Sequence, residues 1–207
     1  LGLIGGSIAK ALRKSEENFQ ISAYDISDST KVALDENVID IALNSINETL
    51  NSDLIFLCLP VEPSLKVLET LAPKLKENAI ITDVCSVKNI FQEKWDKLES
   101  KGFYIGGHPM TGKEHGGYEN SDPLLFENAM YIITDKCEDN VLFQNFTKVI
   151  KSLGPNILHM PAKQHDVIAA SVSHLPQLVS VALVNAASLK TDDYNFLDLA
   201  AGGFRDI

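Results

Sequence analysis

Short apolar runs alternate along the chain with longer segments in which apolar residues recur every three or four positions. The runs are rich in β-branched or aromatic side chains and end at turn residues, as buried strands do. The segments between them have the period of amphipathic helices. This alternation predicts an α/β protein with a doubly wound parallel sheet covered by helices on both faces. The predicted strands are 21–25, 54–59, 79–83, 103–106, 130–134 and 157–160, and the predicted helices are 7–14, 63–76, 87–97 and 138–153.

The pattern changes at Pro161. From there to Leu189 the chain has no glycine and consists mostly of Ala, Val, Leu and Ser. This composition predicts one long helix, kinked near Pro176, whose apolar surface packs against another helix or another subunit. We therefore expect two domains, with the α/β domain at 1–160 and the start of a mostly helical domain at 161–207.

Charge and composition exclude several classes of function. The 207 residues carry 28 acidic and 18 basic side chains, a formal charge of −10, without a basic cluster, so nucleic acid and anionic membranes are not expected partners. Unbroken apolar runs are far shorter than the roughly 20 residues of a membrane span. Three scattered cysteines predict neither a disulfide framework nor a zinc site, and no two histidines have metal-ligand spacing. We expect a soluble, cytoplasmic protein without a metal.

A glycine loop opens the chain. Gly2 and Gly5, with Leu3 and Ile4 between them, match the second and third glycines of G-x-G-x-x-G, so the first glycine and the strand before it would precede residue 1. Such a loop lets the backbone and a helix N-terminus approach a pyrophosphate. Asp25 ends the next predicted strand, where a carboxylate accepts hydrogen bonds from a ribose diol and repels a 2′-phosphate. The spacing predicts NAD as cofactor; a tight turn followed by a capping Asp is the structural alternative.

Polar residues follow three predicted strands, at the edge where open parallel sheets bind ligands. Leu59 and Pro60 follow one strand, Ser86 follows the next, and His108 follows two glycines after the third. A neutral imidazole at such a place can accept a proton near neutral pH. His108 is therefore a candidate base, although a histidine that caps a turn fits the position equally well. Ser86 can form a hydrogen bond to the substrate or to the imidazole, and it can also cap the following helix. Lys88 is expected on the surface, in the first turn of that helix.

Several segments, in this order, resemble the prephenate dehydrogenase family. They run the whole length of the chain, and HPMTGKE and GGFRD are more specific than the glycine loop. The segments are GLIGGS at 2–7, Asp25, LPV at 59–61, DVCSVK at 83–88, GGHPMTGKEHGG at 106–117, SHLPQ at 173–177 and AGGFRD at 201–206.

The resemblance implies a Rossmann-type domain followed by a dimerising helical domain, in an enzyme that uses NAD to decarboxylate prephenate oxidatively to 4-hydroxyphenylpyruvate in tyrosine biosynthesis. It implies that His108 binds the substrate hydroxyl and assists its deprotonation, and that Ser86 helps to position both His108 and the substrate. Glu114 and His174 match residues on the substrate side, although a histidine amid Ala and Val is more often a core residue. Arg205 falls close to the substrate, and a further arginine is expected beyond residue 207 to bind a substrate carboxylate.

Two other functions remain open on the sequence. Arogenate dehydrogenase shares the fold and the histidine but accepts an amino acid side chain on the substrate in place of the keto acid. Gln177 stands where a histidine is often found after SHLP, which leaves open which of the two substrate side chains is preferred. A catalytically silent NAD-binding regulator would keep Gly2, Gly5 and Asp25 without needing His108.

Overall fold

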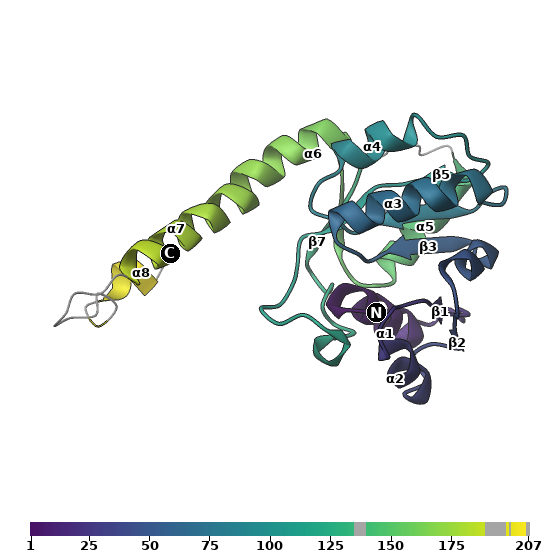
Figure 1. The fold of residues 1–207 in the computed structure, drawn as a ribbon, viewed down its shortest axis with the longest axis horizontal. Coiled ribbons are helices and arrows are strands. Elements are labelled where there is room, and N and C mark those ends of the chain that lie inside the picture. Colours follow the sequence, from purple (N-terminus) through teal and green to yellow (C-terminus); the bar gives the residue numbers. More distant parts are fainter. Residues whose placement is uncertain (135–139, 189–197, 199, 206–207) are drawn as a thin grey trace. The chain divides into compact units, whose positions relative to one another are not determined.

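The computed structural model describes residues 1–134, 140–188, 198 and 200–205 of the chain. It divides into two compact units, Leu1–His165 and Asp166–Ile207, and each is described by itself. The first unit is an α/β domain, and the second is helical where it is described (Figure 1).

The strands of the first unit form three small sheets. Strands β1 and β2 pair in parallel, β4 lies between β3 and β5 with both pairings parallel, and β7 pairs in parallel with β8 and antiparallel with β6. The bounds are β1 Ser22–Ala23, β2 Ile41–Ala42, β3 Leu54–Leu57, β4 Ile80–Asp83, β5 Phe103–Tyr104, β6 Gly107–Pro109, β7 Met130–Ile133 and β8 Asn156–His159.

Neighbouring residues of β4 face opposite layers of the core. Ile80 belongs to a cluster that contains Ile8 of α1 and Phe146 of α5. Ile81 belongs to another cluster, which contains Leu68 of α3 and Phe91 of α4. Because successive side chains of a strand point to opposite faces, helices cover both faces of this sheet, as the alternating sequence predicted. These helices are α1 Leu3–Lys14, α3 Val61–Leu71, α4 Asn89–Trp95 and α5 Val141–Lys151.

Several short elements and some element ends differ from the prediction. β2, β6, helix α2 (Ser29–Asp35) and the 3-10 turns at 46–51 and 118–120 were not predicted, and residues 72–74, predicted in a helix, form a 3-10 turn. Helix α1 begins at Leu3, not Ser7, because packing overrides the low helix propensity of its two glycines. β6 is antiparallel, so the sheets are not wholly parallel. Its Gly-His-Pro sequence is typical of a turn, and the pairing with β7 holds it as a strand.

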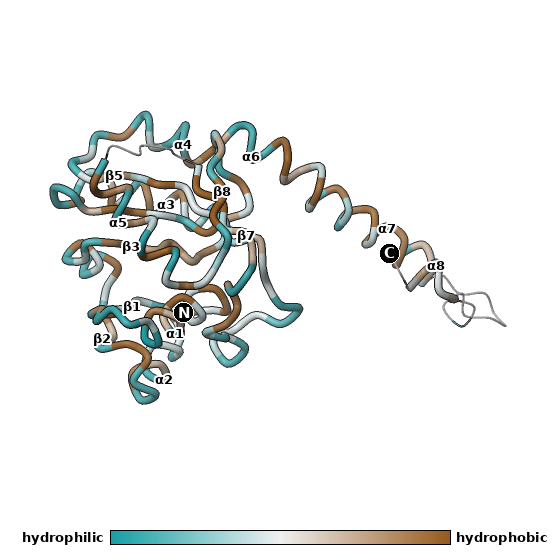
Figure 2. Tube along the Cα trace, turned by 180° about the vertical axis from the view of Figure 1, so that it is seen from behind, coloured by the Kyte–Doolittle hydropathy of each residue, from teal (hydrophilic) through white to brown (hydrophobic). Residues whose placement is uncertain are grey.

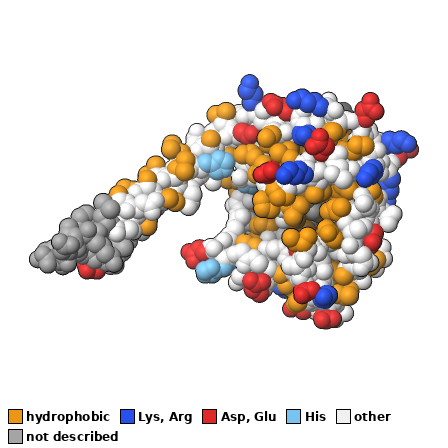
Figure 3. Space-filling model, viewed as in Figure 1, with side chains coloured by type: hydrophobic (Ala, Val, Ile, Leu, Met, Phe, Trp, Pro, Cys, Tyr) orange, Lys and Arg blue, Asp and Glu red, His pale blue; other side chains and the backbone are white. Residues whose placement is uncertain are grey.

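The apolar helix begins with α6 (Ala162–Ala169), whose residues up to His165 belong to the first unit, and it continues through a π-helical turn, Ala170–His174, into α7 (Leu175–Ala187) of the second unit. The sequence predicted a kink near Pro176; the structure has this π turn just before the proline. The helix exposes large apolar side chains such as Val172, Leu175 and Leu178. Much of the helix is coloured hydrophobic in Figure 2, and hydrophobic side chains lie along it in Figure 3.

By length and composition alone, the run Ala162–Ala187 is apolar enough to cross a membrane, with a mean hydropathy of 1.8 over its best window. Ser, His, Gln and Asn interrupt this segment, so it contains no long unbroken apolar run. Only 6% of that window is buried within the chain, so the helix exposes a large apolar surface.

Candidate active site

The glycine loop and α1 form one wall of a cavity. A Cβ atom placed on Gly2 would meet nothing within 4 Å, so the backbone borders open space there. A Cβ atom on Gly5 would lie 3.1 Å from Cβ of Cys58, so Gly5 lets α1 pack closely against the segment after β3. Leu3 and Ile4 lie between them in the first turn of α1, where backbone N–H groups have no partner within the helix. The two glycines thus have the geometry that a pyrophosphate loop needs.

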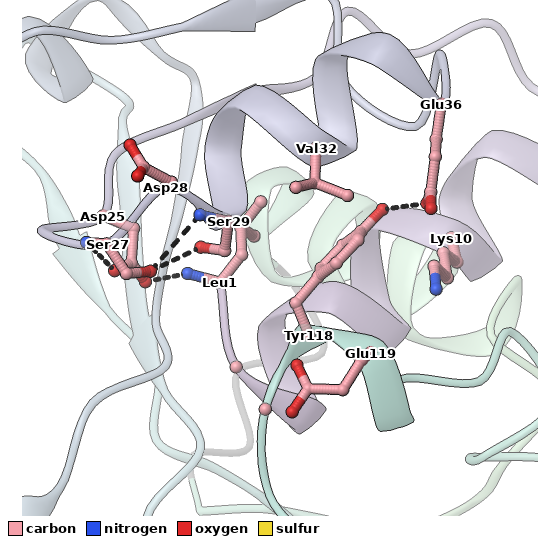
Figure 4. A pocket seen from close by; sticks show the side chains of 12 residues that line it. Leu1, Lys10, Asp25, Ser27, Asp28, Ser29, Val32, Glu36, Tyr118 and Glu119 are labelled. Atoms are coloured by element: carbon pink, nitrogen blue, oxygen red, sulfur yellow. Dashed lines mark hydrogen bonds and ion pairs between the residues drawn. The ribbon is translucent and has the colours of Figure 1, made fainter.

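Asp25, just after β1, lies in the same cavity, whose volume is about 610 Å³ (Figure 4). Its carboxylate accepts a 2.8 Å hydrogen bond from the backbone N–H of Ser27. Burial acts to raise the pKa of Asp25, and hydrogen bonds from the backbone and side chain of Ser27 act to lower it. The carboxylate is therefore charged at neutral pH, as acceptance of two ribose hydroxyls requires.

A residue outside the glycine loop completes the wall of the cavity. The Tyr118 hydroxyl donates a 2.7 Å hydrogen bond to Glu36, and Nζ of Lys10 lies 4.5 Å from the centre of the Tyr118 ring (Figure 4). Four lining residues are acidic, Asp25, Asp28, Glu36 and Glu119, against one lysine. Among the described residues, the lining of the cavity is therefore mainly acidic.

A buried ion pair stands at the end of β4. Asp83 and Lys88 are both fully buried, and Nζ of Lys88 donates to Asp83 and to the carbonyl of Gly107, the latter at 2.6 Å. Asp83 also accepts from the Tyr104 hydroxyl at 2.7 Å and from the Cys85 N–H at 2.8 Å. The expectation that Lys88 lies on the surface is wrong. Its ammonium group joins the end of β4 to the residue before His108.

The same carboxylate influences Cys85. Burial raises the pKa of its thiol to about 11, and the negative charge of Asp83 adds to the effect. Cys85 is therefore a protonated, buried thiol at neutral pH. Cys58 is likewise protonated, since burial raises the pKa of its thiol to about 12. Cys137 lies outside the described residues.

The two glycines before His108 are required by close packing. A Cβ atom on Gly106 would lie 2.3 Å from Oγ1 of Thr134, and one on Gly107 would lie 2.6 Å from the Tyr131 hydroxyl. His108 itself lies in β6, opposite Ile132 of β7, and is 8% exposed. It was predicted in a turn after a strand, and this was wrong. A histidine held in a sheet has a more restricted ring position than one in a turn.

His108 contacts a second buried histidine. Its Nδ1 lies 2.8 Å from Nε2 of His165, which is in the first turn of α6 and fully buried. The two rings meet edge to face, with centroids 5.0 Å apart. His165 was not among the predicted site residues. Its spacing of three residues from Ala162 and four from Ala169 is the signal that the sequence offers, and the structure buries all three residues.

The remaining predicted residues of the first unit lie in loops. Ser86 is exposed between β4 and α4; it is not the N-cap of that helix, which is Lys88. Glu114 is exposed in the loop after β6. Leu59 and Pro60 connect β3 to α3, and the Leu59 carbonyl accepts a 3.0 Å hydrogen bond from Ser64.

Two predicted residues belong to the second unit. His174 ends the π turn and is half-buried, and Arg205 ends the short helix α8 (Gly202–Arg205), its side chain lying outside what the structure describes. In the described parts of the chain, no group of three or more His, Cys, Asp or Glu side chains could hold a metal.

This fold and this cavity define a Rossmann-type nucleotide-binding domain followed by a helical unit. A family model described as the prephenate dehydrogenase nucleotide-binding domain matches residues 8–159, and one described as the prephenate dehydrogenase dimerization domain matches residues 161–207. The chain belongs to the prephenate dehydrogenase family. The exposed apolar face of α6 and α7 lies within the part matched by the dimerization model.

Individual relatives agree with this assignment. Prephenate dehydrogenase from Lactococcus lactis is 34% identical over the whole chain, which spans 58% of that relative's length. The crystal structure of prephenate dehydrogenase from Aquifex aeolicus with hydroxyphenyl propionate and NAD+ has a TM-score of 0.87 and 31% identity, covering 99% of this chain and 73% of that one. Synechocystis arogenate dehydrogenase has a TM-score of 0.83 and 34% identity, covering 100% and 74%.

Lys88→Met tests the buried ion pair. We expect the free energy of unfolding to fall by about 3–5 kcal/mol, because the substitution leaves the Asp83 carboxylate buried without its cation. Urea denaturation measures the change. The double variant Lys88→Met/Asp83→Asn, which removes both charges, should recover much of the loss; a double variant no more stable than the single one would contradict this explanation.

Proposed function

We propose that the complete protein catalyses the NAD-dependent oxidative decarboxylation of prephenate to 4-hydroxyphenylpyruvate and CO2. The observation that carries the proposal is buried His108, which the Lys88 network and His165 hold in place in a chain of this family. Residues 1–160 would be the cofactor domain, and residues 161–207 would begin a substrate and dimerisation domain of a cytoplasmic homodimer. The dimerization match and the exposed apolar helix support the dimer.

The substrate's structure explains which residues are needed. Prephenate has a hydroxyl at C4 of a cyclohexadiene and a carboxylate at C1. Loss of hydride from C4 and cleavage of the bond from C1 to the carboxylate release CO2 and leave an aromatic ring. In this proposal His108 accepts the hydroxyl proton and returns it to the phenolate oxygen, so that protons balance. Ser86 positions the substrate, and Glu114, His174 and Arg205 line its site.

NAD supplies the hydride acceptor when bound. Its pyrophosphate would lie at Gly2, Leu3, Ile4 and Gly5, where α1 offers free N–H groups, and its adenosine ribose would bond to Asp25. Leu59 and Pro60 would border the nicotinamide side. The open space at Gly2 and the acidic cavity support this arrangement, and the solved Aquifex relative has NAD+ bound.

The proposed reaction is tested by adding prephenate and NAD to the complete protein and following NADH at 340 nm. We expect NADH and 4-hydroxyphenylpyruvate in equal amounts. Arogenate is the matched alternative substrate, because a solved relative is an arogenate dehydrogenase. If arogenate is turned over faster than prephenate, arogenate is the substrate and the proposal for prephenate is wrong. NAD binding without turnover of either would indicate a silent regulator.

His108→Asn tests the base. Asparagine keeps a polar group near the position of Nδ1 but has nothing at Nε2, so we expect kcat to fall by about 10²–10⁴ while the Kd for NAD changes less than about twofold. Stopped-flow or steady-state rates give kcat, and a fluorescence titration with NAD gives the Kd. Turnover close to wild type would remove His108 from the mechanism.

Asp25→Asn tests the ribose contact. Loss of the carboxylate should weaken NAD binding by about 10-fold, since charged hydrogen bonds contribute about 1.5–3 kcal/mol, and should narrow the preference for NAD over NADP. The ratio of kcat/KM for the two cofactors measures it. Asp28→Asn, in the same cavity, is the control for general loss of negative charge. An unchanged ratio in Asp25→Asn would refute the assignment.

A further inference from the structure

We infer that His165 is a positioning residue that holds His108 in the tautomer needed for proton transfer, an inference that rests on the proposed role of His108. The 2.8 Å separation between Nδ1 of His108 and Nε2 of His165 is a hydrogen bond, so one nitrogen donates and the other accepts. A single proton lies between the two rings.

The chemistry of the base decides the direction of this bond. His108 can take a proton from the substrate at Nε2 only if its own proton is on Nδ1. Nδ1–H of His108 then donates to Nε2 of His165, which must be neutral with its proton on Nδ1. The reverse direction would place the proton of neutral His108 on Nε2 and prevent it from acting as a base there.

The fold gives His165 a fixed position. The residue is fully buried in the first turn of α6, where its N–H donates to the Pro161 carbonyl at 2.9 Å. That turn follows β8, which pairs with β7, and β7 pairs with β6 on its other edge. The acceptor and the base are thus attached to one three-stranded sheet. When His108 becomes an imidazolium, the same bond becomes charge-assisted and stabilises the cation.

A histidine in this role differs from a carboxylate. A carboxylate beside Nδ1 would favour the imidazolium before substrate arrives, whereas a neutral ring selects the tautomer with a smaller bias toward the charged state. His165 therefore selects the tautomer of His108 without placing a negative charge beside its ring.

The test compares His165→Leu with His165→Gln in the complete protein, with prephenate and NAD as substrates. Leucine fills the space without accepting a hydrogen bond, and the Gln side-chain amide reaches the position of Nε2. We expect kcat to fall about 10- to 100-fold in His165→Leu and to recover about 10-fold over that variant in His165→Gln. KM for prephenate and Kd for NAD should stay within about twofold. Lys163→Leu, exposed on the same helix, is the control and should keep wild-type kcat.

A double-mutant cycle separates positioning from a structural role. In a His108→Asn background, His165→Leu should have no further effect on kcat, whereas structural damage would lower it again. Wild-type kcat in His165→Leu, equal losses in Leu and Gln variants, or additive losses would each overturn the inference. The proposed function fails separately if His108→Asn retains normal turnover, whatever the His165 variants show.

Discussion

The buried contact between Lys88 and Asp83 is the interaction on which the candidate site depends. An ammonium and a carboxylate without solvent are stable only when each is paired and hydrogen-bonded. Here the ammonium group also binds the Gly107 carbonyl, and the carboxylate also binds Tyr104 and Cys85. The contacts of this pair offset the free-energy cost of burying two charges. They also hold three elements together: the end of β4, strand β5 and the start of β6.

From that arrangement the position of His108 follows. Glycines at 106 and 107 let β6 pass close to Thr134, Tyr131 and the Lys88 chain, and no larger residue would fit. The histidine after them is then bounded by the pairing with β7 and by His165. Two constraints therefore act on His108. Lys88 holds the backbone before the residue, which limits the position of the ring, and His165 contacts Nδ1, which limits the tautomer. Such preorganisation is what proton transfer at a defined atom requires.

The sequence predicted the layers of the fold well, because period 2 in strands and period 3.6 in helices follow from which faces are buried. Of the residues that it predicted for the cofactor site, Gly2 and Asp25 border one cavity, and Gly5 packs closely against Cys58. The sequence did not predict features that depend on contacts between residues far apart in the chain. Lys88 follows a strand in a polar loop, and nothing local shows that Asp83 and the Gly107 carbonyl bury it. His108 and His165 are 57 residues apart, so their contact depends on the order of β6, β7 and β8.

The buried lysine also bears on how an acidic chain would bind an anionic substrate. With a net charge of −10, long-range attraction is absent, but charges farther apart than about 8–10 Å are screened in physiological salt, so nearby groups decide. Helix N–H groups at Gly2 can serve a pyrophosphate. Lys88 cannot serve a substrate carboxylate, because it is fully buried and its ammonium group is directed to Asp83 and the β6 backbone. An arginine is better suited to a substrate carboxylate, because its planar fork matches the carboxylate and its charge does not depend on burial.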